Sequence, residues 1–553
     1  MTATHATAQT RRKGAMGLLA MTAAIVVLLA GCTSPPPPAP RAPLKLTVLH
    51  TNDHHGRFWT NAQGEYGLAA RKTLIDQVRA EVAAQGGHVL LLDGGDVNTG
   101  VPESDLQDAE PDFKGMAALK YDAMAVGNHE FDKPLSVLAK QRAWINFPML
   151  AANIYGADGK RLFEPYRIFE RGGYKIAVMG LTTDDTAKMV LPANIQGIRF
   201  RKPAEEAAEV VPQLRAKADM VIAATHMGHY ADGQRGVNAP GDVEMARAVK
   251  GLDLVVGGHS QNTVCMAAEN KRNTAYVPGQ ACAPDRQNGA WIVQAHEWGK
   301  YVGRADFVID AGQVKLERYQ LLPVNLKIRA ADGSQRLAAA QIAEDPALRA
   351  MLEPFQNNGQ ARLSVPVGQS DGVLDGDRER VRKQPTNLGQ LVARSMLDRT
   401  GADLALINSG GLRDSLPAGA ISYRDVLKVQ PFGNTVAVVT LTGAELLDFL
   451  RATARMTPGS GAYPHTAGVQ MQIVGNELQS AQVGRQAIDP LRRYRLAITN
   501  FTASGGDGYP KIDQHPGYVN TGFADADVLR QYIAAHSPLK VANYAPGDDV
   551  SRR

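Results

Sequence analysis

The sequence has little cysteine, little net charge and no internal repeat. Only 3 of its 553 residues are cysteine, too few for a disulfide framework or a four-cysteine zinc ribbon. The formal net charge is +5, and the first 31 residues supply three of these charges because they hold three basic residues and no acidic one. No basic run or face accounts for the remainder, so the composition does not indicate a nucleic-acid polymer as partner.

What is present is an ordinary globular composition. Hydrophobic residues make up 44% of the chain and charged residues 21%, which excludes disordered and collagen-like classes. At roughly 100–200 residues per domain, a chain of this length is expected to form two or more folded units.

The N-terminus has the pattern of an export signal. Arg11, Arg12 and Lys13 precede an uncharged apolar run from Gly14 to Ala30, which leads into Gly31 and Cys32. This pattern resembles a bacterial lipobox, in which the cysteine is lipidated after cleavage. The alternative is a transmembrane anchor, because the run approaches spanning length.

We therefore expect a lipoprotein signal peptide over residues 1–31 and a proline-rich tether over 32–43, with membrane attachment through lipid on Cys32. Thr33 is not the aspartate that would suggest inner-membrane retention, which favours a periplasm-facing lipoprotein of the outer membrane. A soluble periplasmic protein is the alternative. In such an oxidising compartment Cys265 and Cys282 can form a disulfide, although two free buried thiols fit the count equally.

Past the tether, short apolar runs alternate with helix-like stretches, which indicates a layered α/β domain. The predicted strands are Leu44–His50, Val89–Leu92, Met124–Val126, Ile176–Gly180, Met220–Ala224 and Leu252–Val256; the predicted helices are Gly67–Ala84, Glu205–Ala218 and Asp242–Val249.

A second, α+β pattern begins near Ala361. Helices are expected over Asn387–Arg399 and Gly443–Ala454, and strands over Asp403–Ile407 and Val436–Leu441. Between the two parts, Leu337–Phe355 is interpreted as a connecting helix that Pro346 interrupts. The expected domains are thus 44–335, a helical linker and hinge over 336–360, and 361–550.

Polar side chains follow five strands of the first part, at the point where each strand ends. They lie in 51–56, 93–96, 127–132, 225–229 and 257–261, mostly beside glycine. Ligands bind at the carboxyl edge of α/β sheets, and one such loop alone would be an ordinary turn. Five in order, with oxygen and imidazole donors and no thiolate, predict a site for Zn²⁺, Mn²⁺, Fe or Co²⁺. Two such ions can together promote displacement at phosphorus.

These loops carry a resemblance to known families. Asp53-His54-His55, Gly95-Asp96, Gly127-Asn128-His129-Glu130 and Gly258-His259-Ser260-Gln261 resemble the calcineurin-like metallophosphoesterases. Segments 377–382, 408–414, 430–434 and 504–510 resemble the 5′-nucleotidase C-terminal domain. Together they resemble the bifunctional UDP-sugar hydrolase/5′-nucleotidase family. This implies a four-layer α/β/β/α domain followed by an α+β domain.

The resemblance implies roles for individual residues of the first domain. Asp53, His55 and Gln261 would hold one divalent metal ion, and Asn128, His226 and His259 the other. Asp96 would bridge both ions, which would be Zn, Mn or Co. His129 with Asp132 would form a catalytic dyad that stabilises charge on the phosphate, assisted by Asn128. The pattern does not require His54 and His229 as ligands.

In the second domain, Phe432 and Phe501 would stack on the nucleobase, although core packing is the simpler interpretation of either alone. Arg378, Arg382 and Arg413 would bind oxyanions or ribose groups, where a solvated charged face is the alternative for the first two. The remaining implied contacts are Asn408, Gly410, Gly411, Asn434 and Asp507. The family also has a disulfide at the position of Cys265 and Cys282.

The implied activity is hydrolysis of 5′-nucleotides to nucleoside and phosphate, and of UDP-sugars to UMP and sugar 1-phosphate, by metal-activated water attacking phosphorus. Because the metals and the base clamp fall on different domains, we expect the active site to form between them, with a hinge near Leu352–Leu363. The alternatives are a 2′,3′-cyclic-nucleotide phosphodiesterase/3′-nucleotidase, a sulfur-ester hydrolase, or a non-catalytic nucleotide-binding lipoprotein. We expect a monomer.

Overall fold

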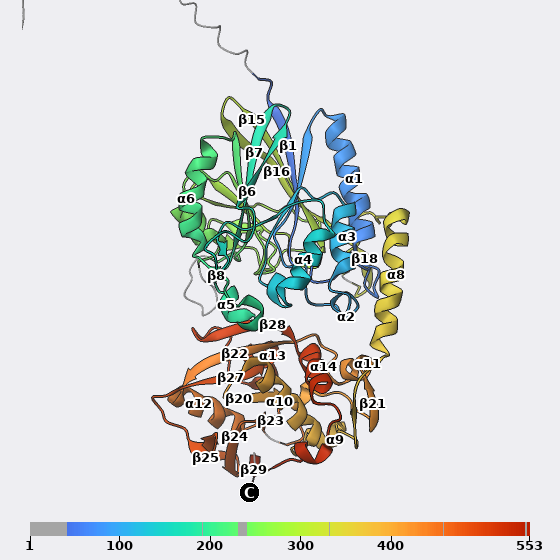
Figure 1. Cartoon of the computed structure of the whole chain (residues 1–553), viewed down its shortest axis with the longest axis vertical. Coiled ribbons are helices and arrows are strands. Elements are labelled where there is room, and N and C mark those ends of the chain that lie inside the picture. The colour runs from blue at the N-terminus through green and yellow to red at the C-terminus, as the bar shows by residue number, and fades with distance from the viewer. Residues whose placement is uncertain are drawn as a thin grey trace, which may run out of the picture. The chain divides into compact units, whose positions relative to one another are not determined.

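The computed structural model describes residues 41–190, 192–230, 240–330, 332–456, 458–547 and 550–552 (Figure 1). The predicted signal peptide, Cys32 and most of the predicted tether lie outside these ranges. Among the described residues, no helix has both the length and the apolar character needed to cross a bilayer.

The N-terminal part contains two six-stranded sheets. In the first, four parallel strands are flanked by an antiparallel hairpin in the order β16-β15-β1-β2-β3-β4. The second has the order β13-β14-β10-β9-β7-β6. The first sheet comprises β1 (Leu44–Thr51), β2 (His88–Asp93), β3 (Ala123–Ala125), β4 (Met149–Leu150), β15 (Tyr301–Asp310) and β16 (Gln313–Pro323). The second comprises β6 (Tyr166–Arg171), β7 (Tyr174–Thr182), β9 (Met220–His226), β10 (Leu254–Val256), β13 (Asp285–Gln287) and β14 (Ala290–Val293).

The two sheets pack against each other and carry helices on their outer faces. Strand β7 shows why, because its side chains alternate between faces: Ile176 and Val178 join the core between the sheets, whereas Ala177 and Met179 join the core beneath the outer helices. Those helices are α6 (Pro203–Arg215) and α7 (Asp242–Ala248) on this sheet, and α1 (Leu68–Ala84) and α3 (Glu110–Ala118) on the other (Figure 1). The predicted four-layer α/β/β/α architecture is confirmed, as are its six predicted strands and three predicted helices.

Shorter elements complete this part and carry its loops. They are α2 (Pro102–Asp105), α4 (Leu135–Ala143), α5 (Thr186–Met189), β5 (Ile154–Tyr155), β8 (Arg199–Phe200), β11 (Met266–Ala268), β12 (Lys271–Arg272), β17 (Lys327–Arg329) and β18 (Gln335–Leu337). Cys265 and Cys282 form a disulfide with their Cα atoms 4.8 Å apart. The disulfide is therefore confirmed over the alternative of two free thiols.

The connecting helix α8 runs over Pro346–Leu363, so the predicted helix Leu337–Phe355 was wrong at both ends. Asp345 caps the helix by accepting a hydrogen bond from the backbone N–H of Leu348 at 2.8 Å. Proline at the first helical position has no N–H to leave unpaired, and Pro346 therefore begins the helix instead of interrupting it. Leu352 packs in the N-terminal core and Leu363 in the C-terminal one.

The C-terminal part has a five-stranded sheet, β23-β20-β27-β22-β28, and a four-stranded sheet, β26-β25-β24-β29. Helices α10 and α14 bury one face of the larger sheet, and α12 packs between the two sheets. The main strands are β20 (Leu404–Asn408), β22 (Thr435–Thr442), β23 (Pro464–Ala467), β24 (Val469–Val474), β25 (Glu477–Val483), β26 (Gln486–Ala487), β27 (Arg493–Thr499), β28 (Tyr518–Ala524) and β29 (Val550–Arg552). A small pair, β19 (Pro366–Ser370) and β21 (Gly419–Ser422), lies beside them. The helices are α9 (Arg378–Val381), α10 (Asn387–Thr400), α11 (Tyr423–Val429), α12 (Gly443–Ala454), α13 (Asn500–Ala503) and α14 (Asp525–His536).

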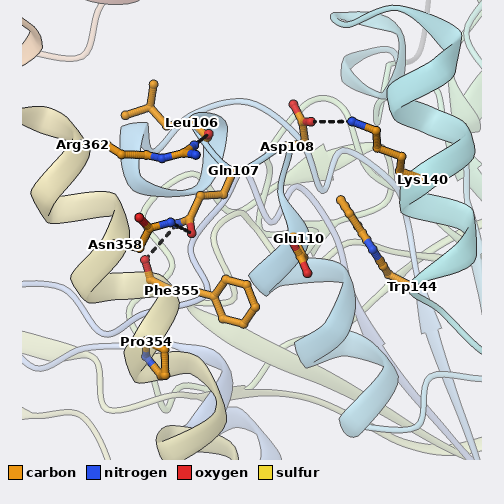
Figure 2. Close-up of a pocket in the computed structure, with 10 residues that line it drawn as sticks. All are labelled: Leu106, Gln107, Asp108, Glu110, Lys140, Trp144, Pro354, Phe355, Asn358 and Arg362. Carbon is orange, nitrogen blue, oxygen red and sulfur yellow. Dashed lines mark hydrogen bonds and ion pairs between the residues drawn. The ribbon is translucent and has the colours of Figure 1, made fainter. Parts of the chain in front are cut away.

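A cavity of about 430 Å³ lies between α8 and the segment that joins α2 to α3, with α4 on its far side (Figure 2). Trp144 and Phe355 present their rings to it, and Gln107 donates to the backbone carbonyl of Phe355 at 2.8 Å. None of the predicted site residues lines this cavity, so we assign it no part in the chemistry described below.

Candidate active site

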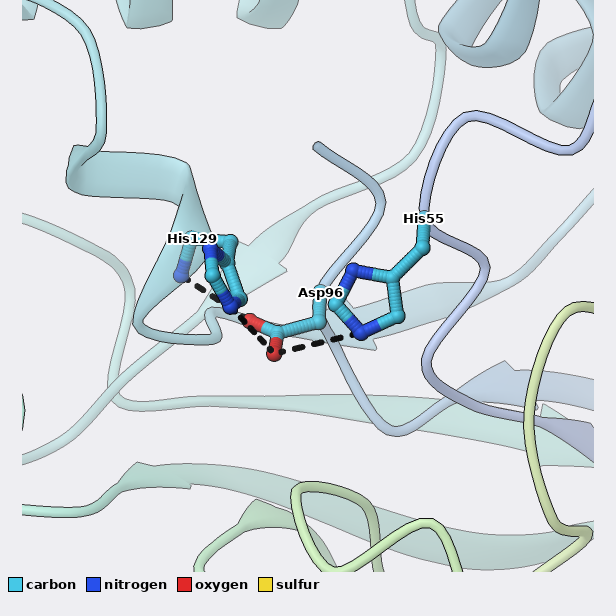
Figure 3. Close-up of side chains that lie close together, drawn as sticks. All are labelled: His55, Asp96 and His129. Carbon is cyan, nitrogen blue, oxygen red and sulfur yellow. Dashed lines mark hydrogen bonds and ion pairs between the residues drawn. The ribbon is translucent and has the colours of Figure 1, made fainter. Parts of the chain in front are cut away.

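The loops after β1, β2, β3, β9 and β10 meet at one edge of the two sheets and bring the predicted metal ligands together. Possible ligand atoms of His55, Asp96 and His129 lie within 4.8 Å of one another, and so do those of Asp96, His226 and His259. Figure 3 shows the carboxylate of Asp96 lying between the rings of His55 and His129. Asp96 belongs to both groups, as expected of a bridging carboxylate.

The first group is built around His55. Its Nε2 lies 3.8 Å from Oδ1 of Asp53, 3.9 Å from Oδ2 of Asp96 and 2.9 Å from Nε2 of Gln261. Both carboxylate oxygens of Asp53 accept from the backbone N–H of His259, at 3.1 and 3.0 Å. The first loop is thereby tied to the fifth.

The second group is equally close. Oδ2 of Asp96 lies 2.9 Å from Nε2 of His226, which is 3.3 Å from Nδ1 of His259. That same Nδ1 lies 3.0 Å from Oδ1 of Asn128. All seven predicted ligands are thus brought together.

The chemistry of these donors fits divalent cations. Nδ1 of His226 lies 2.8 Å from the carbonyl of Gly94, and Nδ1 of His55 lies 2.7 Å from the carbonyl of Thr99. A carbonyl can only accept, so each Nδ1 carries a proton, and Nε2 is the nitrogen of each ring that could ligate a cation once deprotonated. Burying several lone pairs and carboxylates together is unfavourable unless positive charge compensates them.

The backbone at the site is unusual. Asp53, His55, Asp96, His259 and Gln261 have φ values of 51°, 49°, 61°, 77° and 52°, in the left-handed region that side chains larger than glycine seldom adopt. Strained backbone of this kind is concentrated at functional sites, where the surrounding structure maintains it. Five of the seven predicted ligands therefore lie in conformations that are unfavourable in themselves.

His129 and Asp132 form a close pair beside Asp96. Nδ1 of His129 lies 2.6 Å from Oδ2 of Asp132, which also accepts from the hydroxyl of Thr99 at 2.6 Å. Burial opposes protonation of the imidazole, but the carboxylates of Asp132 and Asp96 outweigh it and raise the pKa of His129 to about 10. These carboxylates therefore favour the imidazolium form of His129, which carries a donor at Nε2.

The two neighbouring histidines have other partners. Nε2 of His54 lies 2.8 Å from a carboxylate oxygen of Asp112, and Nε2 of His229 lies 2.9 Å from one of Asp285. Neither histidine belongs to the two ligand groups.

A pocket of about 400 Å³ in the C-terminal part contains most of the predicted substrate contacts. It is lined by Arg382, Asn408, Gly410, Gly411, Arg413, Phe432, Asn434, Gly461, Phe501 and Asp507. Phe432 is 57% exposed and Phe501 41%, so neither is a core residue. Arg378 does not line the pocket, but burial together with the charges of Arg378 and Arg413 lowers the pKa of Arg382.

Gly461 in this pocket and Thr99 at the dyad were not predicted from the sequence. A Cβ atom on Gly461 would lie 3.0 Å from Oδ2 of Asp507, and that oxygen accepts from Nδ2 of Asn408 at 2.7 Å. The glycines at 459 and 461 were the signal that could have indicated a close approach there.

The pocket and the metal-ligand groups are separate in this structure, since the pocket lining includes none of the seven ligands. Strand β28 of the C-terminal part instead contacts the dyad. A Cβ atom on Gly522 would lie 2.2 Å from Cε1 and 2.4 Å from Nε2 of His129. In this arrangement β28 occupies the space at the donor edge of His129.

Comparisons with known proteins agree with this two-part organisation. Residues 46–262 match the family model of calcineurin-like phosphoesterases, and residues 366–514 match that of the 5′-nucleotidase C-terminal domain. The chain is 58% identical to Protein UshA of Escherichia coli (strain K12) over 516 residues, which cover 92% of this chain and 94% of that protein. It is 55% identical to a 5′-nucleotidase of Vibrio cholerae over 543 residues, covering 96% and 98%.

The fold is also that of a solved structure of low sequence identity. The NAD nucleotidase NadN of Haemophilus influenzae aligns with a TM-score of 0.78 at 20% identity, over 92% of this chain and all of that one.

Proposed function

This chain belongs to the calcineurin-like phosphoesterases that carry a 5′-nucleotidase C-terminal domain, and from that premise we propose that it hydrolyses 5′-nucleotides to nucleoside and phosphate. We propose UDP-sugars as a second substrate class, cleaved to UMP and sugar 1-phosphate. The observation that carries the proposal is Asp96, whose carboxylate belongs to two groups of metal-competent atoms beside a protonated histidine.

Asp53, His55 and Gln261 would hold one cation, Asn128, His226 and His259 the other, and Asp96 both. Two divalent cations bound there would supply Lewis acidity at phosphate oxygens and would activate water as the nucleophile. We assign Zn²⁺, Mn²⁺ or Co²⁺ to the site from its mixture of imidazole and oxygen donors.

His129 would donate from Nε2 to a phosphate oxygen as negative charge builds up on the phosphoryl group. Asp132 holds the ring in place through Nδ1 at 2.6 Å and keeps it charged. A charged donor placed in advance stabilises the transition state without reorganising. We assign Asn128 a second role beside this dyad, because its amide lies next to the same centre.

The C-terminal pocket would bind the nucleoside part. The exposed rings of Phe432 and Phe501 would stack on the base, whose π-face is common to all nucleobases. Asp507, held by Asn408, would accept from the sugar or base, and Arg382 and Arg413 would contact oxyanions. Arg378, Asn434, Gly410 and Gly411 would complete the contacts.

A nucleotide held in this pocket can reach the cations only if the two parts of the molecule rearrange. We propose that the C-terminal part moves β28 away from His129 and brings the pocket to the metal-binding edge. The hinge would lie within 352–363, where α8 passes from the N-terminal core to the C-terminal one.

We further propose that the protein is exported and faces the periplasm, attached to the outer membrane through Cys32. The disulfide between Cys265 and Cys282 supports an oxidising compartment. Globomycin treatment of expressing cells tests the lipid, because blocked processing would leave the signal peptide attached. Cleavage of the signal peptide at a site other than Cys32 would refute the lipid attachment.

A substrate panel with Mn²⁺-loaded protein tests the function: AMP, UDP-glucose, 3′-AMP, 2′,3′-cyclic AMP and p-nitrophenyl phosphate. We expect phosphate from AMP and UMP from UDP-glucose, with loss of both on chelation. Preferred turnover of 2′,3′-cyclic AMP would instead establish the cyclic phosphodiesterase, and binding without turnover would establish a non-catalytic protein.

A further inference from the structure

Glu130 follows the dyad histidine in the chain, and the proposed mechanism gives it no part. Its side chain is buried, with 1% of the residue exposed. It is the middle residue of the 3₁₀ turn His129–Phe131, which follows the loop that carries Asn128.

The carboxylate of Glu130 binds main-chain N–H groups of two different loops. Oε1 accepts from Val97 at 2.9 Å and from Asn98 at 3.3 Å. Oε2 accepts from Gly127 at 2.7 Å and from Asp96 at 3.2 Å. Three of these donors belong to the loop after β2, which presents Asp96, and the fourth belongs to the loop after β3, which presents Asn128 and His129.

Only a carboxylate can make this set of contacts. A glutamine has the same shape, but its amide group donates and would face N–H groups with an N–H of its own. A buried carboxylate is unfavourable without compensation, and four oriented N–H groups provide it. Four main-chain N–H groups of two different loops therefore converge on this one buried side chain.

A second hydrogen bond joins the same two loops in the opposite direction. The backbone N–H of His129 donates to Oδ1 of Asp96 at 3.0 Å, so each loop holds the carboxylate of the other. The fit is close, because a Cβ atom on Gly127 would lie 2.1 Å from Oδ1 of Asp96. A change in the contacts of Glu130 would therefore shift Asp96 relative to Asn128 and His129 together.

We propose that Glu130 is a positioning residue that fixes the shared carboxylate of Asp96 relative to Asn128 and His129, and thereby the spacing of the two cations. The proposal rests on the function proposed above. On this proposal, the spacing of the two cations depends on the side chain of Glu130, which touches neither cation. The folding of the domain does not depend on it.

The test compares the Glu130→Gln and Glu206→Gln variants of the full chain, both loaded with Mn²⁺. Glu206 is a matched control because it is also a fully buried carboxylate of this domain, held by Arg161 and Tyr155 at 2.8 Å each. It lies in the first turn of α6, and its partners Tyr155, Arg161 and Arg201 belong to none of the ligand loops. The measurements are the affinity for each Mn²⁺ by calorimetry, the exchange coupling of the Mn²⁺ pair by electron paramagnetic resonance, and kcat and KM for AMP.

For Glu130→Gln we expect one of the two Mn²⁺ affinities to fall at least about tenfold, within the range typical of residues that orient metal ligands. The exchange-coupled signal should weaken or change, and kcat should fall at least about tenfold with KM changed less than about twofold, because the base pocket lies in the other part of the chain. Glu206→Gln should keep wild-type metal affinities and coupling.

Wild-type affinities and coupling in folded Glu130→Gln protein would overturn the proposal. If that variant does not fold, Glu130→Asp takes its place, since it keeps the charge but shortens the reach, and wild-type coupling there would equally overturn it. Failure of the proposed function is distinguishable, because wild-type protein would then bind Mn²⁺ pairs without releasing phosphate from AMP.

Discussion

Replacing His129 by alanine separates two roles that the structure allows for this residue. Its Nε2 lies within 4.8 Å of ligand atoms of His55 and Asp96, so this group alone could hold a cation. Its Nδ1 lies 2.6 Å from Asp132, however, and the neighbouring carboxylates keep the ring protonated. The two proposed ligand sets are complete without His129, and we therefore expect His129→Ala to retain both cations.

The expected loss follows from removing one charged donor. Deleting a single donor that stabilises transition-state charge reduces kcat by about 10²–10³, or roughly 3–4 kcal/mol. KM for AMP should change little because Phe432 and Phe501 lie in the separate pocket. Asp132→Asn should cause a smaller loss, since the neutral amide still meets the ring but no longer favours its charge. The double variant should resemble His129→Ala, because the two residues act as one unit.

The assay measures phosphate release from AMP alongside Mn²⁺ content by elemental analysis, on protein of wild-type melting temperature. Loss of one equivalent of metal in His129→Ala would show that the residue is a ligand. Unchanged kcat, or additive losses in the double variant, would refute the dyad.

Three further predictions concern other parts of the chain. Phe432→Ala and Phe501→Ala should each raise KM for AMP about tenfold, since stacking on one ring contributes about 1–3 kcal/mol. The melting temperature should not change, because both rings are exposed. A lower melting temperature with unchanged KM would identify them as core residues. Burial raises the pKa of Asp525 to about 7, so the folded wild type keeps a proton that the unfolded chain releases, and it loses stability as the pH rises from about 4 to 7. The free energy of unfolding of Asp525→Asn, measured relative to wild type by urea titrations at several pH values, should therefore increase over this range. A difference that does not change with pH would contradict this prediction. Replacing Cys265 and Cys282 by serine should lower the free energy of unfolding by about 3 kcal/mol, as expected for a loop of 17 residues, while a loss of bound Mn²⁺ would place the disulfide in the site.

The strands and the polar residues at their ends could be predicted because both depend on local patterns. A buried strand is a short apolar run, and a ligand loop is a cluster of Asp, His, Asn and Gly directly after it. The parallel order of β1, β2 and β3 then brings Asp53, Asp96 and Asn128 to one edge.

What could not be predicted depends on contacts between distant segments. A proline such as Pro346 can either interrupt a helix or stand at its first position. The hydrogen bond that caps the helix at Asp345 shows that the helix begins at Pro346. The left-handed backbone of Asp53 and His259 is maintained by neighbouring loops and leaves no trace in residue type. The contact of Gly522 with His129 likewise joins segments almost 400 residues apart.

Glu130 is the clearest example of a role that the sequence does not indicate. In the sequence it is one acidic residue beside His129, and nothing local indicates that its partners are main-chain groups of residues 96–98. A backbone donor has no sequence signature, so such a contact becomes visible only in three dimensions.

The most direct test of a cation pair shared by Asp96 is anomalous scattering from crystals of Mn²⁺-loaded wild-type protein and its Asp96→Asn variant. We expect two manganese peaks in the wild type, one on each side of the Asp96 carboxylate, and loss of the pair in the variant. A wild-type crystal with one peak or none at this edge after full loading, or a variant that keeps both, would contradict it.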